Sequence, residues 1–546
     1  MTTTTKPNAI RLSDDVLLSK LADVEQDAET SQPLEDDLDF IFEDVCIAGS
    51  GPIAATYAST IIAEHPTAKV LMVEIGSQDS LIAGEHHKNT IKFQKDIDSF
   101  VHVIKAALQP ISVPPSDSYI PTLGGDAWAP KPNETLITEG HNPHQNPKTN
   151  LRASAVTRTV GGMATHWTCS CPVPDAEERK ENPIENLDEL LDEAKTLLNV
   201  HSDQYDCSIR HTVVKEALLK AYPNRGITNL PLAVERRKDN SDYVTWTGTH
   251  RILEKALASD RFTLLTETRF TKLILHQQKP GEISAAKIRD LRNNRDKYVL
   301  AKAFVVACGA IVLKRSIVDS IPNDPRFAER AKEHKKKYPK DPIPIPFNDP
   351  EPQIMIPYTK DFPWHVQIHR DAFSYGDIGP KADSRVIVDL RFFGKQDIVE
   401  NNQVHFGPPP TTAGDWKPAV TDIYGMPQPT FEVVRNDQDA ERDQRMMRDM
   451  TDVANVLGSF LPGSTPQFME PGLALHITGT TRIGVDPKTS VADPDSKVHG
   501  IKNLWVGGNG CIPDSTACNP TRTSIAIALK GARSIVNSLP VDNTNK

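Results

Sequence analysis

A histidine and an asparagine in the C-terminal part of the chain could together oxidise an alcohol. His476 lies in the segment HITGTTRIG, and Asn519 follows in NPTRTSIA. Oxidising an alcohol removes a hydride from carbon and a proton from oxygen, and a neutral imidazole can accept that proton near neutral pH. By residue type, His476 could therefore act as the base, and Asn519 could hold the hydroxyl as its partner. The alternatives are a buried structural histidine and a helix N-cap before Pro520.

A glycine-rich turn near the start of the chain predicts a dinucleotide site. Residues 49–54 read GSGPIA and fit G-x-G-x-x-G/A, with Gly49, Gly51 and Ala54 at the fixed positions. Such glycines let the backbone approach a pyrophosphate at a helix N-terminus. Glu74 ends the next apolar run, where a carboxylate can accept hydrogen bonds from an adenosine ribose. The alternative is a tight turn without a ligand, with Glu74 as a solvated charge.

A second glycine pair precedes another histidine. Residues 158–168 read RTVGGMATHWT, which places Gly161 and Gly162 shortly before His166 and Thr168. Adjacent glycines indicate that backbone comes close to another group, here with an imidazole beside it. A hydrogen-bonded core histidine would produce the same pattern.

Two further segments combine polar and aromatic residues. Residues 363–376 read PWHVQIHRDAFSYG, and residues 388–394 read VDLRFFG. A sugar site needs hydrogen-bonding groups together with an apolar face, and these strands offer both. A structural ion pair and ordinary core packing would also account for them.

These segments together resemble the glucose–methanol–choline (GMC) oxidoreductases, and in particular the pyranose 2-oxidase family. The His476 and Asn519 motifs occur in the order of that superfamily's signature and flank the turn GGNG, while GGMATHWT and DAFSYG match the narrower family. The resemblance covers 42–170 loosely and 341–535 closely. It implies FAD as the cofactor and an NPT helix directed at the flavin, with Gly508 and Thr521 beside it.

The resemblance also implies individual roles. His166 would bond covalently to the flavin 8-methyl group, and Thr168 would lie near flavin N5. The implied residues on the substrate side are Gln367, Asp371, Phe373, Tyr375 and Arg391. Among these, Asp371 and Arg391 would bind sugar hydroxyls, whereas Phe373 and Tyr375 would gate the pocket.

The implied reaction oxidises a secondary alcohol of a pyranose sugar to a keto-sugar, with hydride transfer to flavin N5. Oxygen, which would give hydrogen peroxide, or a quinone would accept the electrons. The alternatives are a sugar oxidoreductase of a kojic acid-type pathway, a glycoside 3-oxidase, an NAD(P)-dependent dehydrogenase and a non-catalytic flavin-binding protein.

The chain departs from the family pattern in three places. The stretch between Ala310 and Asp341 is shorter than its counterpart, which leaves room for a homo-oligomer but disfavours a tetramer. Ala474 replaces a bulkier branched residue and predicts a roomier pocket. Thr481 stands where the family has a second histidine.

The patterns also predict the elements that must position these groups. Residues 42–74 read as strand, glycine turn, helix and strand, and the continuous apolar runs favour a parallel sheet. Residues 262–275 predict two strands paired with each other, and residues 352–435 predict antiparallel strands. Further expected elements are helices within 185–220 and 437–460, a strand, turn and helix over 301–318, and a C-terminal strand and helix.

The predicted fold class is α/β. An FAD-binding Rossmann-like domain of the GMC and p-hydroxybenzoate-hydroxylase type would interleave with an α+β substrate domain built on an antiparallel sheet. The predicted boundaries are a flexible tail over 1–40, the FAD-binding domain over 41–170, 231–321 and 470–546, the substrate-binding domain over 171–230 and 341–469, and a charged connection over 322–340.

Length and composition limit the classes of function. With 546 residues, two domains are expected, and the net charge of −10 argues against nucleic acid or an anionic membrane as partner. There is no apolar run of 18 residues and no apolar core near the N-terminus, so we expect an intracellular protein without a signal peptide. Seven cysteines fit a reduced protein, and the spacing of Cys169 and Cys171 is not typical of zinc. No metal site is expected.

Overall fold

The computed structural model describes most of the chain from residue 39 onward. The described residues are 39–95, 97–112, 142–275, 279, 281–306, 325–341, 343–369, 385, 388–406, 421, 426–458, 466, 468–469 and 471–541. Within these ranges, no helix has the length and apolar character needed to cross a membrane.

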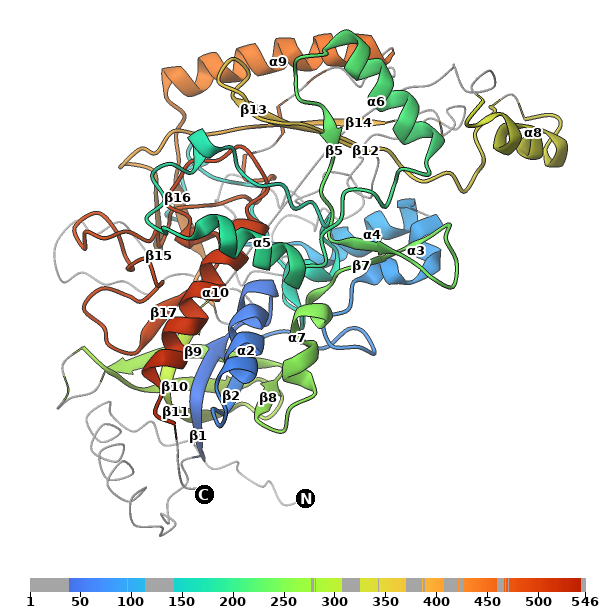
Figure 1. Ribbon diagram of the computed structural model, residues 1–546. Helices are drawn as coiled ribbons and strands as arrows, with labels where there is room; N and C mark the ends of the chain where they lie inside the picture. Colours follow the sequence, from blue (N-terminus) through green and yellow to red (C-terminus); the bar gives the residue numbers. More distant parts are fainter. Residues whose placement is uncertain are drawn as a thin grey trace, which may run out of the picture.

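A seven-stranded sheet forms the base of the molecule (Figure 1). Its strand order is β8-β2-β1-β11-β10-β9, with β17 pairing with β11. The strands β17, β11, β1, β2 and β8 run parallel, whereas β9 and β10 add an antiparallel extension. All four residues of β2 are buried, as expected for a strand covered on both faces. The bounds are β1 Asp39–Ala48, β2 Val70–Val73, β8 Phe262–Leu265, β9 Thr268–Leu275, β10 Ile283–Asp290, β11 Arg295–Val306 and β17 Leu504–Val506.

The predicted pairing of the two strands within 262–275 is wrong. β8 pairs with β2, and β9 pairs with β10. Between them, Glu267 adopts a φ of +48°, and the chain crosses the end of β2. There the N–H groups of Glu267 and Thr268 donate to the carbonyls of Gly76 and Glu74. The short link therefore carries the chain past β2 instead of closing a hairpin.

Four helices pack together beside the large sheet. They are α2 Pro52–Glu64, α5 Leu187–Leu197, α7 Thr249–Leu257 and α10 Thr521–Ser538, and Figure 1 shows α10, α2 and α7 next to one another. Packing between α10 and α2 is close, because a Cβ at Gly531 would lie 2.3 Å from Tyr57 Oη. That hydroxyl donates to the carbonyl of Val506 on β17 at 3.1 Å. The C-terminal strand and helix thus return to the first domain, as predicted, and α5 packs on α10 although it was predicted in the substrate domain.

A smaller antiparallel sheet lies above the first, in the order β14-β13-β12-β5. Its strands are β5 Thr228–Asn229, β12 Gln353–Ile356, β13 Trp364–His369 and β14 Asp389–Gly394. Trp364, Val366 and Ile368 belong to the apolar core that this sheet shares with α6 Ile209–Ala221 and α9 Asp437–Leu457. In Figure 1, α9 runs along the outer side of this sheet. The intervening residues of β13 therefore point to the opposite face, toward the large domain.

Shorter elements complete the described part. They are α3 Ile91–Lys95, α4 Ile97–Ala107, α8 Ala328–Lys337, β3 Gln109–Pro110, β4 Ala155–Val156, β6 Val234–Arg236, β7 Val244–Trp246, β15 Gln403–Phe406 and β16 Pro429–Glu432. The antiparallel pairs β3–β4, β6–β7 and β15–β16 stand apart from the two main sheets.

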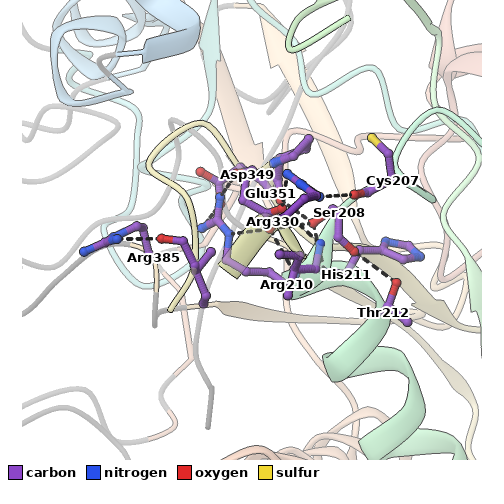
Figure 2. Close-up of polar contacts among 12 residues, drawn as sticks. Cys207, Ser208, Arg210, His211, Thr212, Arg330, Asp349, Glu351 and Arg385 are labelled. Carbon is purple, nitrogen blue, oxygen red and sulfur yellow. Dashed lines mark hydrogen bonds and ion pairs between the residues drawn. The ribbon is translucent and has the colours of Figure 1, made fainter. Parts of the chain in front are cut away.

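The predicted charged connection is partly a helix, and ion pairs attach it to the smaller domain. Figure 2 shows Arg330 of α8 reaching Asp349, at 3.0 Å between Nη2 and Oδ1. The Asp349 carboxylate also accepts from the backbone N–H groups of Ile209 and Arg210, each at 3.0 Å. A negative charge at a helix N-terminus stabilises the helix. Asp349 therefore fixes the start of α6 and at the same time holds α8 to it through Arg330.

Candidate active site

The inner face of β13 presents polar side chains from alternate positions. His365, Gln367 and His369 share this face, and all are buried. The antiparallel register places Phe393 opposite His365, and Arg391 opposite Gln367. A buried polar face in an otherwise apolar strand costs free energy unless its groups find partners, so it marks a site rather than a scaffold.

The structure brings the two predicted catalytic residues together on this face. Asn519 Nδ2 lies 3.5 Å from His476 Nε2. Asn519 directly precedes Pro520 and α10, while His476 follows Leu475, whose φ is +52°. The imidazole of His476 stacks on Phe393 of β14, with ring centroids 5.4 Å apart. The large domain thus supplies the pair, and the small sheet provides the wall behind it.

Burial keeps the imidazoles of the site neutral. It lowers the pKa of His476 to about 4. Burial also lowers the pKa of His365 to about 3, with a smaller contribution from the charge on nearby His476. A neutral imidazole has a lone pair available, so His476 is in the form that a general base requires at neutral pH.

Three residues that the sequence did not single out, Ser170, His365 and Phe393, complete the surroundings of the catalytic pair. Ser170 Oγ donates to Asn519 Oδ1 at 3.1 Å. Gln367 Nε2 also hydrogen-bonds Asn519 Oδ1, and it lies 3.1 Å from His365 Nε2. Phe393 is the third residue. His365 could have been found from its spacing, because a residue two positions before Gln367 on a strand shares its face.

The two glycine turns lie against each other at the start of α2. The N–H of Gly161 donates to Ser50 Oγ at 3.0 Å, and a Cβ at Gly162 would lie 3.3 Å from the Cα of Gly51. Gly49 and Gly161 have φ values of +91° and +97°, which favour glycine. A Cβ at Gly161 would also meet the Cα of Gly84 at 2.6 Å, so no other residue fits there.

Glu74 follows β2 and is buried beside this turn. Its carboxylate accepts from Ser50 Oγ at 2.7 Å, from the Ser50 N–H at 3.1 Å and from the Gly76 N–H at 2.8 Å. Burial raises the pKa of Glu74, while these hydrogen bonds act in the opposite direction. The carboxylate therefore braces the glycine turn, and its predicted contact with a ribose stays a prediction.

His166 lies buried just after the second glycine turn. Its Nε2 is 2.8 Å from Thr157 Oγ1, and its buried Nδ1 has no hydrogen-bond partner among the described residues. Burial lowers the pKa of His166 to about 3, so the ring is neutral. Thr168 follows two positions later and is half-buried.

Other predicted residues occupy the same region or fall outside it. Ala54 is buried in the first turn of α2, Gly508 with φ +110° precedes a short 3-10 turn, and Thr521 is the first residue of α10. Gln367 and Arg391 are buried neighbours on β13 and β14. The predicted gating and substrate residues Asp371, Phe373 and Tyr375 lie outside the described residues. Within the described ranges, no group of three or more His, Cys, Asp or Glu could hold a metal.

Comparison with known proteins decides the family. The GMC oxidoreductase family matches residues 410–528. Pyranose 2-oxidase from Tricholoma matsutake is 58% identical and is aligned over 97% of this chain and 100% of its own length. Pyranose 2-oxidase from Lyophyllum shimeji is 42% identical over 91% of this chain and 92% of its own length. The chain belongs to the pyranose 2-oxidase family of GMC oxidoreductases.

The likeness within the pyranose 2-oxidase family is wider than the motifs alone indicated, because it extends over nearly the whole chain. Among solved structures, formate oxidase from Aspergillus oryzae has a TM-score of 0.58 at 14% identity, covering 92% of this chain and 99% of that chain. This similarity confirms the predicted α/β GMC fold.

Membership of this family implies FAD, and the described residues fit it. The helices α2 and α10 both begin without a side-chain hydrogen bond to their first N–H groups, at Gly51 and Pro520. A Cβ at Gly51 would meet no atom within 4 Å. Helix N-termini without a cap bind anionic groups. The pyrophosphate and the flavin of bound FAD would supply such groups. Gly49, Gly51, Gly161 and Gly162 would hold the nucleotide part, while His166 and the start of α10 would hold the ring.

Proposed function

We propose that this chain oxidises a secondary alcohol of a pyranose sugar to a keto-sugar. The observation that carries the proposal is the contact between His476 and Asn519, at 3.5 Å, on a buried polar face at the uncapped start of α10. The 58% identity to a pyranose 2-oxidase supports the sugar as substrate.

Bound FAD would supply the acceptor for the hydride that leaves the sugar carbon. The chain supplies the proton acceptor, since neutral His476 takes the hydroxyl proton through Nε2. Asn519 donates an N–H toward the same point and would hold the sugar oxygen there. Gln367 and Arg391 lie next to the pair and would bind further hydroxyls. The two electrons and two protons would finally pass to oxygen, giving hydrogen peroxide, or to a quinone.

Anaerobic mixing of the purified flavoprotein with a panel of monosaccharides tests this function. We expect a pyranose to bleach the flavin absorbance, and admission of air to restore it with formation of hydrogen peroxide. NMR of the product identifies the oxidised carbon and separates a 2-oxidase from a 3-oxidase. Failure of every sugar to reduce the flavin would overturn the proposal.

We further propose a covalent bond between His166 and the flavin. A buried, neutral imidazole with a ring nitrogen that lacks a partner supports this bond. We expect the flavin to remain on acid-precipitated wild-type protein and to be released from His166→Ala. Mass spectrometry of the flavin peptide should place the bond on the segment that contains His166. His86→Ala is the control, because His86 is equally buried but its Nε2 donates to the carbonyl oxygen of Trp167 at 2.9 Å. Release of the flavin from the precipitated wild type would contradict the covalent bond.

The pH dependence follows from the lowered pKa of His476. The base must be unprotonated, so activity is present above this pKa and is lost as the pH falls through it. Because the pKa is about 4 and not the ordinary value of about 6.5, we expect kcat/KM for the sugar to stay level from pH 8 to about pH 5. It should then fall tenfold for each further pH unit below about 4. Measurements in buffers of constant ionic strength check this, and a decline already at pH 6.5 would contradict the neutral, buried base.

The intracellular location and an assembly smaller than a tetramer stay proposals. Light scattering of the purified protein would settle the number of chains in the assembly.

A further inference from the structure

Four side chains, two of them the catalytic pair, form a continuous series of hydrogen bonds, which we call the polar chain. His365 Nε2 lies 3.1 Å from Gln367 Nε2, Gln367 Nε2 hydrogen-bonds Asn519 Oδ1, and Asn519 Nδ2 lies 3.5 Å from His476 Nε2. The chain therefore begins at one imidazole and ends at the other. Among the described residues, hydrogen bonds link His365 to the catalytic pair only by way of Gln367.

Such a chain can run in two directions, because each amide can present either its oxygen or its nitrogen. In one direction, Gln367 Nε2 donates both to His365 Nε2 and to Asn519 Oδ1. Because the oxygen of the Asn519 amide then faces Gln367, its NH₂ group faces His476 and donates to it. In the other direction, His365 carries its proton on Nε2, and the oxygen and nitrogen of both amides exchange places. The oxygen of Asn519 then faces His476, which must donate a proton from Nε2. Only the first direction leaves His476 Nε2 unprotonated. Its single lone pair then accepts from Asn519 across 3.5 Å, and a substrate hydroxyl can replace this long contact.

Burial favours the first direction. The other end of the Gln367 amide is buried and has no partner among the described residues. In the first direction this end is a carbonyl oxygen, whereas in the second it would be an NH₂ group with two unsatisfied donors. Unpaired buried N–H groups are rarer and more costly than under-satisfied carbonyls.

Ser170 is consistent with the same direction. Gln367 Nε2 has two protons and three acceptors within reach, namely His365 Nε2, Asn519 Oδ1 and Ser170 Oγ at 3.0 Å, so two of these acceptors share one proton. The hydroxyl of Ser170 then donates to Asn519 Oδ1 at 3.1 Å, so that this oxygen accepts from two donors. A hydroxyl can either donate or accept, so Ser170 reinforces the direction but does not select it. In this direction the proton of neutral His365 lies on Nδ1, and its Nε2 is the acceptor that ends the series of hydrogen bonds.

We propose that His365 is a positioning residue: its unprotonated Nε2 orients the amides of Gln367 and Asn519 so that His476 Nε2 stays unprotonated and can accept the proton of the substrate hydroxyl when this hydroxyl replaces the contact with Asn519. The expected effect of His365 on the rate of flavin reduction rests on the proposed function. The same orientation leaves Gln367 Oε1 free to accept a hydrogen bond from a second hydroxyl of the substrate.

Three variants test this role in the full-length flavoprotein. His365→Leu removes the acceptor with a similar volume, and His365→Gln restores an acceptor oxygen. His211→Leu is the matched control, because His211 is also buried in the smaller domain but bonds Asn229 and the N–H of Gln353, away from the pair. The measured quantities are the anaerobic rate of flavin reduction at saturating sugar and the sugar concentration for half-saturation.

We expect His365→Leu to slow flavin reduction about 10–100-fold, with half-saturation changed less than about threefold. His365→Gln should recover to within about fivefold of the wild type, and His211→Leu should match the wild type within about twofold. A wild-type rate in His365→Leu would overturn the proposal, as would equal rates in His365→Leu and His365→Gln.

A second measurement does not depend on turnover or on a variant of His365. In wild-type protein labelled with ¹⁵N-histidine, we expect His476 Nε2 to show the chemical shift of an unprotonated ring nitrogen at pH 7, assigned by its loss in His476→Ala. A protonated Nε2 would overturn the proposal. If no sugar reduces the wild type, the proposed function fails, and this spectrum still decides the direction of the chain.

Discussion

Replacing His476 with alanine is expected to slow sugar-driven flavin reduction by about 10²–10⁴-fold, the range that a positioned general base supplies. The variant leaves Asn519 in place but removes the group that accepts the hydroxyl proton. Stopped-flow measurement of flavin bleaching under nitrogen gives the rate directly, without a contribution from reoxidation. Half-saturation by the sugar should change far less than the rate, because the lost interaction acts mainly in the transition state.

His499→Ala is the matched control for this prediction. His499 lies in the same C-terminal segment, but its Nε2 contacts Ser490 Oγ and the carbonyl of Gly484. Its replacement should leave flavin reduction within about twofold of the wild type, as is usual away from the reacting atoms. A His476→Ala variant that reduces its flavin as fast as the control would show that another group takes the proton.

Gly161→Ala is expected to abolish accumulation of flavin-loaded protein. Its backbone φ of +97° disfavours any side chain, and the added Cβ would lie 2.6 Å from the Cα of Gly84. The strain and the overlap together should lower the free energy of unfolding by roughly 3–5 kcal/mol, a large share of what a domain has. The ratio of flavin to protein absorbance and the melting temperature of the purified variant measure the effect.

Gly500→Ala separates the strain from the overlap. Gly500 also has a positive φ, of +76°, but a Cβ there would meet no atom within 4 Å. This variant should lose only about 1–2 kcal/mol and keep its flavin. Equal flavin loss in both variants would mean that backbone strain alone, and not the close approach to Gly84, accounts for the result.

The parts of the site that the sequence predicted are those encoded by neighbouring residues. The glycine turn at Gly49 and Gly51 depends on local backbone freedom and on the helix that follows, so its pattern is visible in a few letters. His476 and Asn519 were predicted as a pair from motif order, and the structure places them 3.5 Å apart. The resemblance to a known family supplied the roles that residue types alone left open.

The parts that the sequence did not predict depend on contacts between distant segments. Ser170 bonds Asn519 across 349 positions of the chain, and no local pattern distinguishes it from any other serine. The pairing of β8 was misjudged for the same reason, since its partner β2 lies far earlier in the chain. A short link between two apolar runs is typical of a hairpin, and only tertiary structure shows that it passes the end of β2 instead.

The order in which the ribosome synthesises the elements of the large domain determines when this domain can take up flavin. β1 and α2 emerge first during synthesis, yet β17 and α10, which complete the sheet and cover α2, are among the last elements made. Domains usually fold as units from the N-terminus while the chain grows, but this one lacks a strand and a helix until residues 504–538 have been made. Cofactor loading must therefore wait until β17 and α10 have left the ribosome, and a message truncated before Leu504 would yield a chain that cannot retain flavin.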